Sequence, residues 1–150
     1  MPDNVTPFRP RRPTPKPVQR SGGVSSHRGK AVLVQALTLT AFVMSFFMPA
    51  APLSYLAMAV GIAAAAIALS NRADAMPWAT THHEHALRTL IGGYAIWVLA
   101  TLLGFINGSL VVVTIYIHIA VLIWVAIRAG IGLVLAVLRK PISNPRGPLL

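Results

Sequence analysis

Four long apolar stretches limit the fold of this chain more than any other feature of its sequence. Charged side chains are missing from three of them, and the fourth contains Arg88 alone: residues 31–48, 53–70, 110–127 and 86–106. At 1.5 Å per residue, an 18-residue helix covers about 27 Å, close to the roughly 30 Å hydrocarbon core of a bilayer. The pattern predicts an all-α integral membrane protein with four transmembrane helices, at about 31–48, 53–70, 86–106 and 110–128.

Composition and turn residues agree with this interpretation. Of the 150 residues, 55% are hydrophobic and 11% charged, whereas a soluble domain carries about 25% charged residues. Pro49 and Pro52 separate the first two stretches, and an Asn-Gly-Ser turn at 107–109 separates the last two. The chain has no cysteine, which excludes disulfides and thiolate metal sites.

The two ends of the chain differ from the apolar stretches. Residues 1–30 hold seven of the 13 Lys and Arg residues and six of the 12 prolines, which predicts a disordered, Pro/Arg-rich cytoplasmic tail. After the fourth stretch, residues 129–138 continue apolar, and we expect either a bend near Gly130 or an interfacial extension over 129–138. Residues 139–150 are expected to form a second cytoplasmic tail.

The basic residues predict the orientation in the membrane. The short turns at 49–52 and 107–109 hold no basic residue, and the remaining loops and tails carry them. By the positive-inside rule this indicates a multi-pass protein of the cell inner (plasma) membrane with both termini cytoplasmic. Anionic lipid headgroups are then the expected partners of the basic cytoplasmic ends, and a nucleic acid is not. The residues expected at this interface are Trp78, Trp124, Arg88, Arg128 (by snorkelling), Arg139 and Lys140.

A polar run precedes the third apolar stretch. Residues 81–88 read Thr-His-His-Glu-His-Ala-Leu-Arg, and Glu84 and Arg88 have the i, i+4 spacing of a helical ion pair. We interpret the run as the polar start of a helix at the cytoplasmic interface, with Thr80 or Thr81 as its N-cap.

The histidines of this run leave two alternatives open. On a helix, His82 and His85 lie one turn apart on one face, so they are weak candidates for a metal site. Zinc needs at least three protein ligands, so no resident metal or cofactor is expected. Sensing of pH is the other alternative.

His118 lies close to the middle of the fourth stretch, where an ionisable side chain suggests a function. It predicts either a structural hydrogen bond between helices or a proton or solute pathway. Polar residues on other stretches are its candidate partners: Gln35, Thr38, Thr40, Tyr55, Tyr94 and Thr101.

Small residues recur along two of the stretches. Ala57, Gly61 and Ala65 repeat every four residues on the second, and the third carries Gly92, Gly93, Ala100 and Gly104. Small side chains let helix backbones approach closely. These faces are expected to pack within the chain, or to form an interface with a second copy or another membrane protein.

The polar run and the C-terminal region together resemble a known family. Thr81 and His82 through Arg88 and Thr89, followed by Gly93, resemble the SHFRxQIRTFWxG pattern of small bacterial inner-membrane proteins of unknown function. These proteins are grouped with a subunit of the plastid Tic protein-import translocon.

The second part of the resemblance lies near the end of the chain. Trp124, Arg128, Gly132 and residues 140–142 fall at the spacings of that family's WxxYRxxxGW and GKPI patterns. The resemblance covers residues 78–142 and implies a Tic-like four-helix membrane protein. The positions it would share are His82, Arg88, Thr89, Arg128 and Gly132. The chain departs from the pattern at Glu84, Ala86, Ile131 and Leu133.

Sequence motifs for catalysis are missing, because the chain has no Gly-rich phosphate loop, nucleophile elbow or paired carboxylates. We therefore expect a non-enzymatic membrane scaffold or assembly subunit, in which small-residue faces and basic cytoplasmic ends hold partners and anionic lipid. One alternative is a small channel or transport subunit that uses His118. Another is histidine-based sensing of a metal or of pH at His82 and His85.

Overall fold

The computed structural model describes residues 26–50, 52–73 and 76–147. In these ranges the chain forms α1 (His27–Phe47), α2 (Leu53–Asn71), α3 (Pro77–Ile106), the 3-10 turn η1 (Gly108–Leu110) and α4 (Val111–Val137). The four α-helices of the described residues are each long and apolar enough to cross a membrane. The predicted all-α class is therefore confirmed for this part of the chain. Most of the predicted N-terminal tail, residues 1–25, and the last three residues lie outside it.

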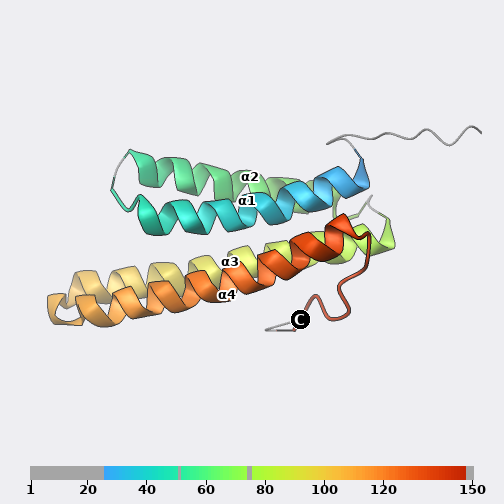
Figure 1. Ribbon diagram of the computed structural model, residues 1–150. Coiled ribbons are helices and arrows are strands. Elements are labelled where there is room, and N and C mark those ends of the chain that lie inside the picture. The colour runs from blue at the N-terminus through green and yellow to red at the C-terminus, as the bar shows by residue number, and fades with distance from the viewer. Residues whose placement is uncertain (1–25, 51, 74–75, 148–150) are drawn as a thin grey trace, which may run out of the picture.

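The helices form two hairpins that lie along one another (Figure 1). One hairpin is α1 with α2 and the other is α3 with α4, and α1 packs against each of the other three helices. The shared core is apolar and includes Val34, Phe42, Leu90 and Val125. Phe42 stacks on Tyr94 with ring centroids 4.5 Å apart, so an aromatic contact joins the two hairpins in the middle of the bundle.

The α3–α4 hairpin reaches further than the α1–α2 hairpin. Phe46 contacts Trp97 with ring centroids 6.5 Å apart, one residue before α1 ends. The nine residues of α3 after Trp97 extend to Ile106, which is about 13 Å at 1.5 Å per residue. The turn between α3 and α4 accordingly extends beyond the turn between α1 and α2 (Figure 1). Residues 98–106 and 111–117 are called the projecting hairpin below.

Helix α3 begins well before the predicted span at 86. Pro77 occupies its first turn, where the fixed φ of proline suits a helix and the missing N–H costs nothing. The predicted N-cap at Thr80 or Thr81 is wrong, because Met76 holds that position and the Thr81 hydroxyl donates to the Trp78 carbonyl instead. The polar run is therefore part of a helix that continues without interruption into the apolar span.

Helix α4 also differs from its prediction. It runs as one uninterrupted helix through Gly130 to Val137. Ala129, Gly132 and Ala136 are buried, which makes the expected interfacial extension part of the bundle. The reason is the contact between Gly132 and α1 described below, which holds this last part of α4 against the bundle.

Candidate functional site

The buried polar side chains gather at the end of the bundle where α3 begins and α4 ends. Gln35 of α1 donates from Nε2 to the His82 carbonyl over 3.1 Å, and the same atom lies 3.5 Å from Nδ1 of His85. All three residues are fully buried. On the α4 side, a Cβ at Gly132 would lie 2.7 Å from Cδ of Gln35. Gln35, His82, His85 and Gly132 are called the polar cluster below, and they join α1 to α3 and α4.

The C-terminal segment, residues 138–147, folds back over this cluster. Nε2 of His82 lies 2.9 Å from the Lys140 carbonyl. The Ile142 N–H donates to the Thr81 hydroxyl over 3.1 Å, and the Ile142 side chain is buried. The segment is therefore anchored to the first turns of α3 by side chains of the predicted polar run.

Arg128 fixes the same segment from the other side. Its Nε donates to the Thr89 hydroxyl over 3.0 Å and its Nη1 donates to the Gly147 carbonyl. The guanidinium group lies 5.2 Å from the centre of the Trp124 ring, in cation–π range. With 2% of its surface exposed, Arg128 does not snorkel. The prediction that it extends to the lipid interface is wrong, because the C-terminal segment covers it.

The other residues expected at the lipid interface are more open. Arg88 donates from Nε to Oε1 of Glu84 over 2.7 Å, which confirms the predicted i, i+4 ion pair. Arg139 and Lys140 are exposed at the end of α4. Trp78 lies edge-on to His82, with ring centroids 5.9 Å apart. Contact of these residues with lipid stays a prediction.

His118 joins α3 to α4. Its Nε2 lies 3.2 Å from the Thr101 hydroxyl and 3.2 Å from the Trp97 carbonyl. Its ring lies on the Trp97 ring at 4.3 Å between centroids. Thr38 and Gln35 do not contact it, because Thr38 donates to the Val34 carbonyl and Gln35 belongs to the polar cluster. Of the two interpretations, the geometry matches the structural hydrogen bond between helices.

The small residues of α2 and α3 receive side chains from neighbouring helices. A Cβ at Gly93 would lie 2.5 Å from Cζ of Phe42, and one at Gly104 would lie 3.0 Å from Cγ2 of Thr114. Gly61 faces the Tyr94 ring in the same way. Ala57 is buried, and Ala65 packs against the core. The small-residue faces are thus used for packing within the chain.

The histidines do not form a metal centre in this conformation. The structure shows no group of three or more His, Cys, Asp or Glu side chains placed to hold a metal ion in the residues it describes. His82 and His85 bond instead to Lys140 and Gln35. The weak metal candidates are therefore used to hold helices and the C-terminal segment together.

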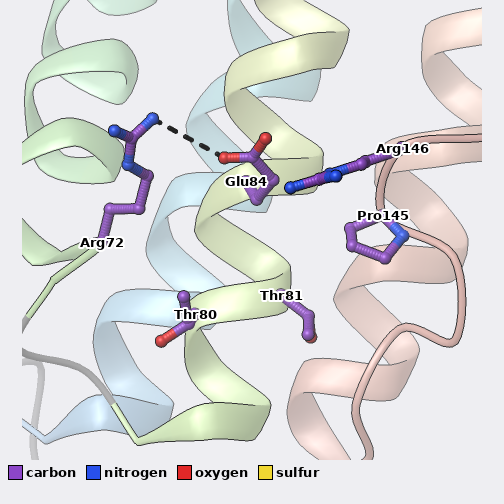
Figure 2. Close-up of a pocket in the computed structure, with 6 residues that line it drawn as sticks. All are labelled: Arg72, Thr80, Thr81, Glu84, Pro145 and Arg146. Atoms are coloured by element: carbon purple, nitrogen blue, oxygen red, sulfur yellow. Dashed lines mark ion pairs between the residues drawn. The ribbon is translucent and has the colours of Figure 1, made fainter.

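Sequence reasoning missed one group of residues. Arg72 at the end of α2, Glu84 of α3 and Arg146 of the C-terminal segment line one pocket (Figure 2). The sequence holds only three acidic residues, and one of them, Glu84, lies beside three histidines. This rarity could have marked Glu84 as a candidate site residue. Its proximity to Arg146, which is 62 positions away, depends on the fold-back of the C-terminal segment.

The residues that carry the family resemblance meet in space. His82 bonds to Lys140, Arg128 bonds to Thr89, and Gly132 contacts Gln35. Both sequence patterns therefore contribute to one packed region. No family model, curated protein or solved structure matches this chain.

Proposed function

We propose that this chain is a multi-pass protein of the cell inner (plasma) membrane with both termini in the cytoplasm. The proposal is supported by the apolar helices and by the position of the charges. Basic residues lie at one end of the bundle, whereas the 107–110 turn at the other end carries no charge. That distribution follows the positive-inside rule, and these basic residues are Arg28, Lys30, Arg72, Arg88, Arg139, Lys140 and Arg146.

Within the membrane, we propose a non-enzymatic role as a scaffold subunit that self-associates through the projecting hairpin. The observation that carries this proposal is an apolar groove of about 190 Å³ that α1 and α2 leave uncovered. It is lined by Ile96, Leu99, Ala100, Leu103 and Ile117.

A second copy of this chain is the occupant we propose for the groove. The same hairpin carries exposed side chains at i, i+3 and i+4 on α4, a spacing that forms a ridge on a helix: Val112, Ile115 and Tyr116. Ridges of one helix pack into grooves of another, so one copy has the side chains that would fill the groove of its neighbour.

The alternatives have less support. A channel or transport role would need His118 to face a pathway, and its ring nitrogen bonds within the α3–α4 pair. Metal sensing at His82 and His85 would need a third ligand, and the described residues hold no group of three side chains placed for a metal ion. Sensing of pH stays a prediction, since Nδ1 of His82 and Nε2 of His85 are buried without a hydrogen-bond partner among the described residues. Membership of the Tic-like family stays a proposal that rests on the sequence resemblance.

The lack of native cysteine permits a direct test of self-association. Leu99→Cys places a thiol on the groove, where the side chain is 66% exposed. Leu56→Cys is the matched control, because its side chain is 52% exposed on α2. The depth of the two positions is matched through the contact between Gly61 of α2 and Tyr94 of α3. Leu56 lies five residues before Gly61 and Leu99 lies five residues after Tyr94. Because α2 and α3 run antiparallel, the two residues lie at a similar depth in the membrane.

Oxidation in membranes is expected to produce disulfide-linked dimers of the Leu99→Cys protein and not of the Leu56→Cys protein. Light scattering in mild detergent should then report a mass above that of one chain. A monomeric protein that forms no dimer through Leu99→Cys would contradict the scaffold proposal.

Orientation is tested with the same cysteine-free background. Ser109→Cys is expected to react with a membrane-impermeant maleimide from the outside of spheroplasts, and Asn144→Cys is expected to react only in inside-out vesicles. Labelling of Asn144→Cys from the outside would contradict the proposed topology.

A further inference from the structure

A pocket of about 480 Å³ opens at the basic end of the bundle (Figure 2). The end of α2, the first turns of α3 and the C-terminal segment form its walls. The lining residues are Arg72, Thr80, Thr81, Glu84, Pro145 and Arg146. Figure 2 shows the Arg72 and Arg146 side chains on opposite sides of the Glu84 carboxylate.

The charges around this pocket do not cancel. Oε1 of Glu84 lies 2.7 Å from Nε of Arg88. Its other oxygen, Oε2, lies 3.7 Å from Nη1 of Arg72. Arg146 adds a further positive charge from the C-terminal segment. Three arginines against one glutamate leave a formal charge of +2. Because Arg88 compensates Glu84 at close range, the surplus belongs to Arg72 and Arg146, the two arginines that line the pocket.

The backbone that carries Arg146 is held in place. Its neighbour Gly147 accepts a hydrogen bond from the buried Arg128, and Ile142 is bonded to Thr81. The pocket wall is therefore positioned by Arg128, which lies outside the pocket, and by Thr81, which lines it. A ligand that binds there does not have to order the C-terminal segment, so less of its binding free energy is lost to conformational entropy.

We propose that this pocket binds the phosphate of an anionic phospholipid headgroup, a phosphodiester that carries a glycerol hydroxyl. Guanidinium groups form paired, charge-assisted hydrogen bonds with phosphate oxygens. Arg72 and Arg146 hold the phosphate from the two sides of the pocket. Oε2 of Glu84, released by Arg72, accepts a hydrogen bond from the headgroup hydroxyl. This proposal rests on the membrane insertion proposed above, because that insertion places the pocket at the level of the lipid headgroups.

The test uses the full chain purified in an uncharged detergent. Thermal unfolding is followed while phosphatidylglycerol or phosphatidylcholine is added at constant ionic strength. The pocket variant is Arg72→Gln with Arg146→Gln. The control variant, Arg28→Gln with Arg139→Gln, removes the same charge from exposed positions outside the pocket.

Phosphatidylglycerol is expected to raise the unfolding temperature of the wild type in a saturable way, and phosphatidylcholine is not. The pocket variant should bind phosphatidylglycerol roughly tenfold more weakly or worse, the loss typical of a charge-assisted hydrogen bond. The control variant, which removes only the attraction between exposed basic residues and anionic headgroups, should lose clearly less affinity than the pocket variant. Equal losses in the two variants, or no preference for phosphatidylglycerol, would overturn the proposal.

Inorganic phosphate, titrated alone, distinguishes the two sources of the phosphate group. Saturable protection by millimolar phosphate that the pocket variant loses assigns the site to free phosphate, and protection by the lipid alone assigns it to a headgroup. Protection by neither overturns the proposal.

Glu84→Gln supplies a second variant, because it removes the repulsion between the carboxylate and the phosphate and keeps both pocket arginines. The amide oxygen of glutamine can still accept the hydrogen bond from the headgroup hydroxyl. It is expected to bind the phosphate group as tightly as the wild type or more tightly, and weaker binding would overturn the proposed arrangement. Lipid binding by a monomeric protein and dimer formation through Leu99→Cys are separate readouts, so this proposal and the scaffold proposal can fail independently.

Discussion

Replacement of Arg128 gives the most informative test of how the C-terminal segment is held. Arg128→Met keeps most of the length of the side chain and removes its bonds to Thr89 and Gly147. Thr89 stays satisfied, because its hydroxyl donates to the His85 carbonyl over 2.8 Å. The Gly147 carbonyl can bind water once the segment opens. We therefore expect the change to release residues 143–147 locally and to leave the helices packed.

The magnitude follows from the bonds that hold the segment. A hydrogen bond from a charged donor contributes about 1.5–3 kcal/mol, so its loss raises the local opening constant roughly 10- to 150-fold. The remaining contacts are the buried Ile142 side chain, worth about 1.5–3 kcal/mol, and the bonds from His82 and Thr81, about 0.5–1.5 kcal/mol each. These contacts keep residues 140–142 in place.

Hydrogen–deuterium exchange of the detergent-solubilised protein measures this effect residue by residue. The Gly147 amide, which donates to Asn144, should exchange faster in Arg128→Met, and the Ile142 amide should change much less. Lys140→Gln is the control, because the bonds of Lys140 in the fold come from its backbone N–H and carbonyl, which the substitution keeps. Unchanged exchange at Gly147, or a general loss of protection in α1 and α3, would refute the reasoning.

Three further predictions concern α4 and Arg139, which follows its C-cap, and are checked by thermal unfolding in detergent. Gly132→Ala should destabilise the protein by about 1–3 kcal/mol, because its Cβ meets Gln35. Gly130→Ala, the matched control in open space, should stabilise it by about 0.5–1 kcal/mol; equal effects would contradict the close α1–α4 contact. Arg139→Gly should stabilise by about 1 kcal/mol, because Arg139 has φ 56°, and a loss of stability would show that its side chain has a role. His118→Leu should destabilise by about 0.6–1.7 kcal/mol without a change in proteoliposome flux, and reduced flux would favour transport.

The helices could be predicted from the sequence because their determinants are local. Stretches without charge, proline pairs and the Asn-Gly-Ser turn each act over a few residues, and they define where a spanning helix fits. The Glu84–Arg88 pair depends only on the helical repeat. The small residues of α2 and α3 were recognisable as packing faces for the same reason, although their partners, such as Phe42 for Gly93, were not.

The site could not be predicted, because contacts between distant residues create it. His82 bonds to a carbonyl 58 positions away, and Arg128 bonds to Thr89 across 39 positions. A single arginine next to an apolar stretch is expected to extend towards water. Arg128 is buried because residues 138–147 fold back and provide a carbonyl acceptor. The helical repeat does not predict the position of those residues, because they lie after the end of α4.

The unequal lengths of the two hairpins connect the fold with the proposed self-association. Gln35 and His85 lie at one level, and from there α1 runs 12 residues to Phe47 while α3 runs 21 residues to Ile106. These lengths are about 18 and 31 Å, so α3 extends about 13 Å further than α1 from that level.

On the proposed insertion, the turn between α1 and α2 therefore lies deeper in the bilayer than the turn between α3 and α4. Backbone polar groups without partners are costly there. Pro49 and Pro52 have no N–H to satisfy, and the N–H groups of Met48, Ser54 and Tyr55 bond to carbonyls of this hairpin. These bonds suit the turn to an apolar environment, and beyond it the apolar groove of the projecting hairpin is not covered by α1 or α2. A second copy packed against the apolar groove would provide that cover. Cross-linking of the Leu99→Cys protein is therefore the most direct test of the scaffold proposal.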